Sequence, residues 1–195
     1  MKYLLSWSLC ALLLLFSAGC DSDSDVDDPD DLANGRANVQ LTIGGDTETI
    51  NDGFAYFFVD SEEDGGFGLI IIDRNINDFN TTQTGKIIVV ASDVSQLPPT
   101  GTYTLLDAGG NTDTGYYGGY LDFAGTSGIN VIGSSTGGTF RVTGSSNSNL
   151  SGTVNMTGET VTLSGTVGTF SLELSFNATS NPGAVGIGGL GKALQ

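Results

Sequence analysis

The feature of this sequence that most constrains its fold is a two-residue alternation of apolar and polar side chains. The alternation is clearest from Thr169 to Phe176, where Phe170, Leu172 and Leu174 are separated by polar residues. Successive side chains of a strand point to opposite faces of a sheet, so this segment is predicted to be a half-buried strand. In the body of the chain no apolar spacing of 3.6 residues continues for two turns, and no helix is expected there.

Three earlier segments, residues 54–59, 67–72 and 86–91, are apolar on both faces. Such runs are typical of central strands that are covered on both sides. Glycine, asparagine, aspartate and proline cluster between the segments, as turns require. The spacing predicts an all-β fold, an antiparallel β-sandwich or partly closed barrel of about ten strands.

A weak internal repeat supports successive pairing near the C-terminal end. The segment from Gly138 to Gly144 resembles that from Gly152 to Gly158, fourteen residues later, and Gly165 begins a third copy. This pattern predicts a meander of neighbouring strands, and a true solenoid is the alternative. The all-β domain is expected to span residues 36–180. A loose, glycine-rich C-terminal tail is expected over residues 181–195.

The N-terminus has the pattern of an export signal. After Lys2, an apolar run extends from Leu4 to Ala18. These 15 residues are too few for a membrane-spanning helix, which needs about 20, but they fit the apolar region of a secretory signal peptide. Residues 1–19 are therefore predicted to be a signal peptide, and a buried core helix is the alternative.

The run ends in Ser17-Ala18-Gly19-Cys20, which resembles the lipobox of bacterial lipoproteins. The resemblance implies that residues 1–19 are removed and that the sulfur of Cys20 carries a diacylglyceryl group. Acyl chains, palmitate among them, would then anchor the protein to a membrane. Ordinary cleavage that leaves a free thiol at Cys20 is the alternative.

Residues 21–31 carry seven carboxylates and one apolar side chain. Such a stretch cannot bury enough apolar surface to fold, so residues 20–35 are expected to form a lipidated cysteine and a disordered tether. An acidic stretch after a lipidated cysteine is similar to surface-export signals of some Gram-negative bacteria, whereas Asp21 directly after Cys20 resembles an inner-membrane retention signal of others. We expect the outer membrane of the cell envelope, with surface exposure.

Charge and composition exclude several functions. The chain has 22 acidic and 6 basic residues and no histidine. Nucleic-acid binding needs clustered lysine and arginine, and a Ser-His-Asp hydrolase needs a histidine base. The two cysteines, Cys10 and Cys20, precede the body, so neither a disulfide framework nor a Cys/His zinc site is expected there.

Carboxylates are the remaining catalytic candidates, because a glycosidase needs two of them in a cleft lined by aromatic residues. The candidate residues are Glu62, Glu63, Asp73, Asp78, Asp107 and Asp122. Most lie in turn-like contexts, and Trp7 would leave with the signal peptide, so the mature chain would have no tryptophan. The protein is therefore not expected to be an enzyme.

Two groups of residues are candidate ligand sites. Tyr116, Tyr117 and Tyr120 are flanked by glycines and could form a stacking surface for a polar ligand such as a glycan; the alternative is packing within a sheet. Asp107, Asn111 and Asp113 concentrate oxygen atoms as calcium sites do, although a solvated turn is the alternative and only weak calcium binding is expected. No other cofactor is expected.

These observations predict a lipid-anchored lipoprotein of the bacterial envelope that acts as a non-catalytic binding or structural β module, with a glycan as a candidate ligand. Two further classes stay open. One is an adhesin or surface-layer subunit, which would show an exposed apolar patch or an unprotected edge strand. The other is a carboxylate-dependent, glycan-active enzyme. An envelope protein is the other candidate partner.

Overall fold

The computed structural model describes residues 28–60, 65–74, 84–108, 115–124 and 128–181. These residues form one short 3-10 helix, η1 (Pro29–Asp31), and nine strands. The strands are β1 (Arg36–Ile43), β2 (Asp46–Val59), β3 (Phe67–Ile72), β4 (Thr84–Ser92), β5 (Gly101–Leu106), β6 (Tyr116–Ala124), β7 (Ile129–Ser145), β8 (Asn149–Thr162) and β9 (Val167–Ser180). The described part of the chain contains no helix long and apolar enough to cross a membrane.

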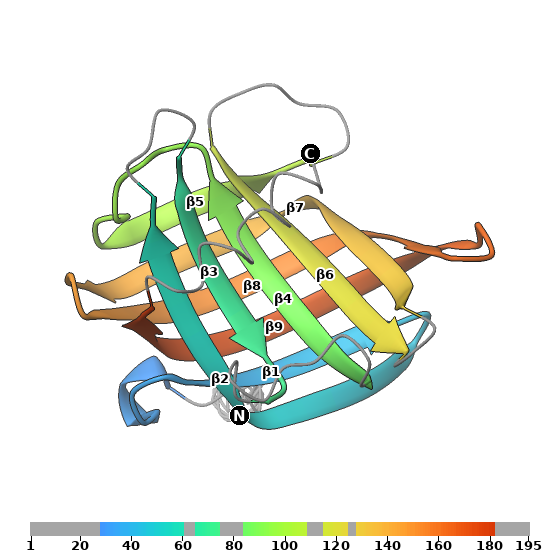
Figure 1. Cartoon of the computed structure of the whole chain (residues 1–195), viewed down its shortest axis with the longest axis horizontal. Coiled ribbons are helices and arrows are strands. Elements are labelled where there is room, and N and C mark those ends of the chain that lie inside the picture. The colour runs from blue at the N-terminus through green and yellow to red at the C-terminus, as the bar shows by residue number, and fades with distance from the viewer. Residues whose placement is uncertain (1–27, 61–64, 75–83, 109–114, 125–127, 182–195) are drawn as a thin grey trace, which may run out of the picture.

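The strands close into a ring, in the order β1, β2, β3, β4, β6, β5, β7, β8, β9 and back to β1. Figure 1 shows the ring as two layers, with the second half of β2 and β3, β4 and β6 crossing in front of β1, β5, β7, β8 and β9. β2 contributes to both layers: Asp46 to Ile50 pair with β1, and Phe54 to Val59 pair with β3. Asp52 lies between these halves with a φ of 58°, a left-handed conformation that aspartate tolerates better than most residues.

The predicted all-β fold is confirmed, with nine described strands where about ten were expected. Most neighbours are antiparallel, as predicted. Two short parallel pairs, β5 with β6 and β2 with β9, were not foreseen. The strands β7, β8 and β9 pair in succession, so the predicted meander is confirmed.

The interior of the ring is filled by apolar side chains from every strand. Phe140 stacks on both Phe67 and Phe176 with ring centroids 6.1 Å apart. Glycine leaves room for a large side chain of the core at one position, because a Cβ at Gly158 would collide with the ring of Phe170. The interior is therefore a packed core along most of its length.

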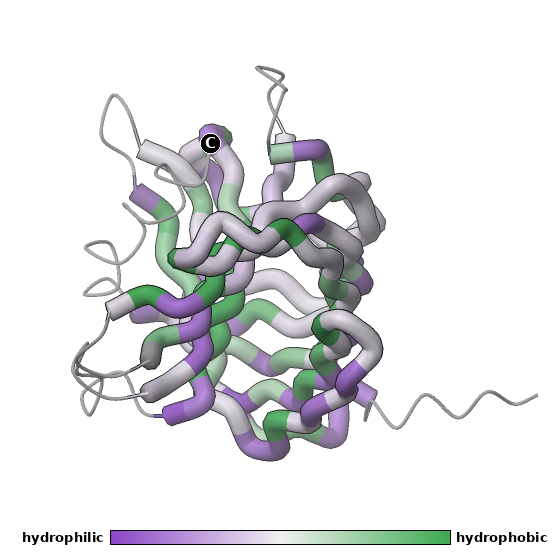
Figure 2. Tube along the Cα trace, turned by 90° about the vertical axis from the view of Figure 1, so that its right-hand side faces the viewer, coloured by the Kyte–Doolittle hydropathy of each residue, from purple (hydrophilic) through white to green (hydrophobic). Residues whose placement is uncertain are grey.

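The segments predicted to be covered on both faces are the second half of β2, β3 and β4, and all six residues of β3 are buried. Their inward side chains join the core, and their outward side chains join a second apolar cluster with β6. Figure 2 shows the two layers from the side, with hydrophobic segments in both.

The described chain begins on the outside of the ring, beside β8 and β9. Pro29 of η1 is buried, and the Nδ2 group of Asn177 on β9 donates to the carbonyl of Leu32 at 2.7 Å. Asn149 at the start of β8 donates to Asn34 at 3.2 Å and also to Asn177. These contacts hold residues 28–35 at the end of the ring where β1 begins.

Candidate functional site

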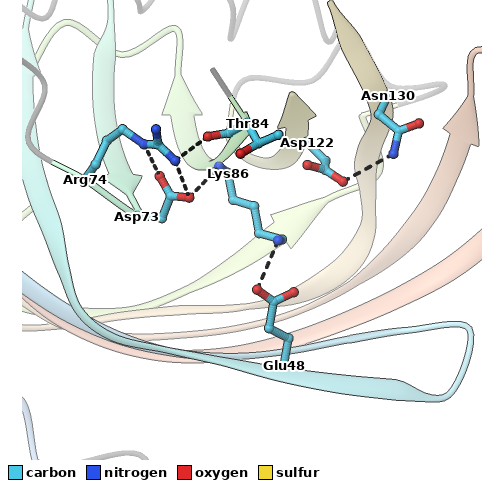
Figure 3. A network of polar contacts seen from close by, with 7 residues as sticks. All are labelled: Glu48, Asp73, Arg74, Thr84, Lys86, Asp122 and Asn130. Carbon is cyan, nitrogen blue, oxygen red and sulfur yellow. Dashed lines mark hydrogen bonds and ion pairs between the residues drawn. The ribbon is translucent and has the colours of Figure 1, made fainter. Parts of the chain in front are cut away.

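Polar side chains gather at the mouth of the ring that lies near the end of β1. We call this group the polar mouth; its residues are Glu48, Asp73, Lys86, Tyr120 and Asp122 (Figure 3 shows all of them except Tyr120). Strand alternation directs each of them inward. Lys86 is two residues before the core residue Ile88, and Asp122 is two residues after the core residue Tyr120.

The register across the strands brings these residues together. Lys86 on β4 is the pairing partner of Asp122 on β6. Glu48 on β2 pairs with Leu41, a core residue of β1, and so it also faces inward. Asp73 directly follows β3, two residues beyond the core residue Ile71.

Hydrogen bonds and ion pairs connect the polar mouth (Figure 3). The ammonium group of Lys86 donates to Oε1 of Glu48 at 3.0 Å. Asp73 accepts from Nε of Arg74 at 2.9 Å and from the backbone N–H of Lys86 at 3.2 Å. The Arg74 guanidinium also donates to the carbonyl of Thr84, and its hydrogen bond to Asp73 is the main cause of its raised pKa.

Tyr120 lies beneath the charged groups and is fully buried. Its hydroxyl has no hydrogen-bond partner among the described residues. Burial raises the pKa of Tyr120 well above its ordinary value, and the negative charges of Asp122, Glu48 and Asp73 raise it further. As a buried unpaired group, the hydroxyl costs about 1–3 kcal/mol of stability.

The upper part of the polar mouth is open to solvent. The side chains of Asp73 and Lys86 are 22% and 21% exposed, and that of Glu48 is 56% exposed. Asp122 accepts a long hydrogen bond, 3.5 Å, from Asn130, which is its only one from the described residues. The site thus offers carboxylate acceptors and an ammonium donor at the surface, with a phenol below them.

The structure separates the three tyrosines predicted to bind a ligand. Tyr116 and Tyr120 point inward and Tyr117 points outward, because adjacent residues of β6 alternate. Tyr116 is at the opposite end of β6 from Asp122. It packs against Tyr103 and Phe140, with ring centroids at 4.8 and 5.3 Å, and burial raises its pKa to about 12.

Because Tyr117 and Tyr120 are buried, the three tyrosines do not form one accessible surface. A ligand role for each of them stays a prediction. Of the three, Tyr120 is the one that the structure brings to a cluster of polar side chains.

The remaining predicted sites fall partly outside the described residues. Cys20, Asn111 and Asp113 lie there, as do Glu62, Glu63 and Asp78. Asp107 is described and exposed, directly after β5. Among the described residues, no group of three or more aspartate, glutamate, cysteine or histidine side chains is placed to hold a metal ion, and the calcium site stays a prediction.

Two of the predicted carboxylates, Asp73 and Asp122, do lie in the polar mouth. Sequence reasoning missed their neighbours Glu48 and Lys86. The available signal was the alternation of side chains along each strand, because Lys86 occupies the inward position just before the core residues Ile88 and Val90.

A second surface of interest lies where β8 ends and where β7 and β9 begin. Ile132, Val161, Leu163 and Val167 are the most exposed large apolar residues there, at 39%, 48%, 71% and 65%. Ile132 pairs with Val161, which pairs with Val167, so these three residues form one patch across the three strands, and Leu163 lies in the turn that follows β8. We call it the hairpin patch.

The chain matches no protein-family model, and comparison with curated proteins and with solved structures gives no significant match.

Proposed function

We propose that this protein is a lipid-anchored binding module of the bacterial envelope, and that its polar mouth binds an uncharged, hydroxylated ligand such as a glycan without chemically changing it. One observation carries this proposal: an unpaired, buried hydroxyl of Tyr120 lies beneath inward-facing carboxylates and Lys86 in a ring that is otherwise filled by apolar residues. Buried polar groups in folded proteins are nearly always hydrogen-bonded, so an unpaired hydroxyl calls for a partner such as a ligand or an ordered water.

The chemistry of the polar mouth favours a ligand rich in hydroxyl groups. Each ligand hydroxyl can donate to a carboxylate such as Asp122 and accept from the ammonium of Lys86. An anionic ligand would meet three carboxylates in the site and a formal net charge of −16 on the chain. Lys86 on β4 also stands between Asp73 and Asp122, which favours binding over the paired-carboxylate chemistry of a glycosidase.

The proposed membrane anchor rests on the resemblance of Ser17-Ala18-Gly19-Cys20 to a lipobox and on the acidic tether after it. The attachment of residues 28–35 to β8 and β9, at the end where β1 begins, supports an orientation in which the polar mouth faces away from the membrane. The proposal includes outer-membrane, surface-exposed display, which rests on the similarity of the acidic stretch after Cys20 to surface-export signals.

Binding is tested with residues 20–195 carrying Cys20→Ser, applied to a glycan array and then titrated against any glycan that binds. We expect Lys86→Met and Asp122→Asn each to weaken binding at least tenfold. The matched control is Glu173→Gln, which changes a carboxylate on the outer face of β9. Equal binding by the control and the polar-mouth variants, or no bound glycan at all, would reject the proposed site.

The anchor is tested separately by growing cells with radiolabelled palmitate. The label should enter the native protein and be absent from Cys20→Ser. Protease treatment of intact cells should then remove the body from the cell surface. Unlabelled native protein would remove the anchor from the proposal and leave the binding test unaffected.

The hairpin patch favours a second candidate function, an adhesin or surface-layer subunit. Exposed apolar patches mark protein contacts, and Ile132, Val161 and Val167 are neighbours across three strands. If this function holds, Val161→Asp with Val167→Asp should abolish self-association in sedimentation experiments, whereas Lys86→Met should leave it unchanged.

A further inference from the structure

A row of hydroxyl groups crosses the outside of the ring near the polar mouth. Its members come from four neighbouring strands and are Thr42 on β1, Ser171 on β9, Thr157 on β8 and Thr136 on β7. Thr42 pairs with Ser171, Ser171 pairs with Thr157, and the hydroxyl of Thr136 donates to the carbonyl of Thr157 at 3.4 Å. The four strands lie side by side in one layer (Figure 1). The row therefore extends over three strand intervals, about 14 Å.

These residues line a hollow of about 360 Å³, which we call the hydroxyl groove. Its volume is within the range of small-molecule sites, roughly 300–1,000 Å³. All of its lining residues belong to the described part of the chain. Besides the row, they are Gly44, Gly45, Gly158, Glu159, Thr169 and Phe170.

Three hydroxyls of the groove are available to a ligand. The side chains of Thr157, Thr169 and Ser171 are exposed, and their hydroxyls have no hydrogen-bond partner among the described residues. Thr42, in contrast, shares a hydrogen bond of 2.9 Å with Thr47 of β2. Because a hydroxyl can both donate and accept, the groove suits a ligand that carries hydroxyl groups of its own.

The groove carries little charge, in a chain with a formal net charge of −16. Glu159 is the one charged residue in its lining, which contains no lysine or arginine. An anionic ligand would therefore meet a carboxylate and no cation. Phe170 is only 3% exposed and offers little stacking surface. These properties favour a neutral ligand held by hydrogen bonds.

The β1–β2 hairpin separates the hydroxyl groove from the polar mouth. Thr42 of the groove pairs with Thr47, and the next residue, Glu48, faces inward into the polar mouth. The turn of the hairpin is Gly44-Gly45, with φ of 60° and 98°. A Cβ added at either glycine would have no atom within 4 Å, so the space beside this turn is open. An extended ligand can therefore cross the turn from one site to the other.

The hydroxyl groove alone would bind a glycan weakly, because hydrogen bonds to exposed hydroxyls replace bonds to water at little net gain. A glycan that also occupies the polar mouth avoids this limit. Its contact with the groove is then intramolecular, and the high effective concentration of the linked sugars raises the affinity. The two sites are therefore expected to act together on one chain.

We propose that the hydroxyl groove is a second subsite for the glycan of the polar mouth, and that the ligand is an extended, neutral oligosaccharide or polysaccharide. One end of the bound segment is held by Lys86 and Asp122 inside the ring. The following sugars cross the turn between β1 and β2 and lie along the row from Thr42 to Thr136. This inference rests on the proposed function and adds the length of the ligand and its path.

The test uses residues 20–195 with Cys20→Ser and isothermal titration calorimetry. The probes are ladders of neutral oligosaccharides from a glucan, a mannan and a galactan, each from the disaccharide upward. Oligomers long enough to reach both sites should bind about tenfold more tightly than the disaccharide, or better. Thr157→Val with Ser171→Ala should remove this gain and leave binding of the disaccharide unchanged.

The matched control is Thr139→Val with Thr104→Val. These two exposed threonines pair with each other on β7 and β5, outside the hydroxyl groove. Their substitution should leave binding of both short and long oligomers unchanged. Urea denaturation of each variant checks that the fold is kept.

The possible results separate this inference from the proposed function. No binding by any oligomer rejects both. Equal affinity for short and long oligomers, or equal losses in the groove variant and its control, overturns this inference alone. Long-oligomer binding that survives Lys86→Met and Asp122→Asn but is lost in the groove variant makes the groove a separate site, which overturns the shared chain.

A second measurement needs no substitution in the groove. In isotope-labelled protein with Cys20→Ser as its only change, the backbone amide resonances of Gly44, Gly45 and Ser171 should shift with a long oligomer and not with the disaccharide. The resonance of Lys86 should shift with both. A long oligomer that shifts Lys86 and none of the other three would also overturn the inference.

Discussion

The ammonium group of Lys86 donates to the carboxylate of Glu48 at 3.0 Å, which joins β4 to β2 across one mouth of the ring. The two residues are 38 positions apart in the sequence. They meet because the ring closes and because both occupy inward positions of their strands. The contact places a cation at the mouth of the ring that also holds Asp73 and Asp122.

Replacing Lys86 by methionine removes this cation but keeps most of the length of the side chain. Because the ion pair is partly exposed, the free energy of unfolding should fall by only about 0.2–1 kcal/mol. Glycan binding should fall at least tenfold in a titration under the same conditions. A loss of stability of several kcal/mol would instead assign Lys86 a structural role.

Tyr120→Phe removes a buried hydroxyl that has no described partner. Its removal should raise the free energy of unfolding of the ligand-free protein by about 1 kcal/mol, measured by urea denaturation. The same change should weaken ligand binding if the hydroxyl serves the site. Ser175→Ala, which removes the other unpaired buried hydroxyl of the described chain, should be stabilising without an effect on binding.

Tyr116 should make stability depend on pH in the alkaline range. Burial, and secondarily Tyr103, raise its pKa from 10.0 to about 12 in the folded protein. Below pH 10 both states keep the proton, so the tyrosine contributes no pH dependence. Between pH 10 and 12 the unfolded state releases its proton first, and the free energy of unfolding should therefore fall as the pH rises.

The measurement is urea denaturation at several pH values across this window, compared with Tyr116→Phe. The variant should show a flatter decline than the native protein. Parallel curves for the two proteins would assign the decline to other groups. Absorbance of the phenolate in the folded protein should show at least one tyrosine that loses its proton well above its ordinary pKa of 10.0.

Gly152→Ala should destabilise the fold through backbone contact. A Cβ at Gly152 would collide with the carbonyl oxygen of Arg141 on β7, and backbone cannot move aside as a flexible side chain can. We expect a loss of about 1–3 kcal/mol by thermal or urea denaturation.

The control for this prediction is Gly137→Ala, because a Cβ at Gly137 would have no atom within 4 Å. Its effect should be within about 0.5 kcal/mol, as for most surface changes. Similar losses in the two variants would mean that glycine flexibility, rather than close approach of β7 and β8, sets the cost.

The two-residue periodicity of apolar side chains was enough to predict the strands and which of their faces are buried. The segment 67–72 coincides with β3, and its two apolar faces correspond to the core inside the ring and the second apolar cluster formed by outward side chains. The alternation from Thr169 to Phe176 lies within β9, with its apolar residues in the core. Both features depend only on residues near one another in the chain.

The candidate site could not be predicted in the same way. Tyr116 and Tyr120 share a face of β6, but Tyr116 packs against Tyr103 and Phe140 whereas Tyr120 packs against Phe170. Their spacing in the sequence suggested a common surface that the fold does not make. The sequence marked Asp73 and Asp122 as candidate carboxylates but did not indicate that they lie in the same site. Their proximity to Lys86 depends on β4 lying between β3 and β6, while β5 pairs with β6 and β7. That order is set by long-range pairing, which periodicity does not specify.

The asparagine contacts at the start of the domain also bear on its mechanical resistance. If the protein is tethered through its N-terminus, a pull on the tether reaches the fold at Leu32 and Asn34. Asn177 and Asn149 pass this load to β9 and β8, which are paired along their whole length. Drag on the body would then shear many hydrogen bonds together, whereas a tether attached to β1 alone would peel that strand one bond at a time.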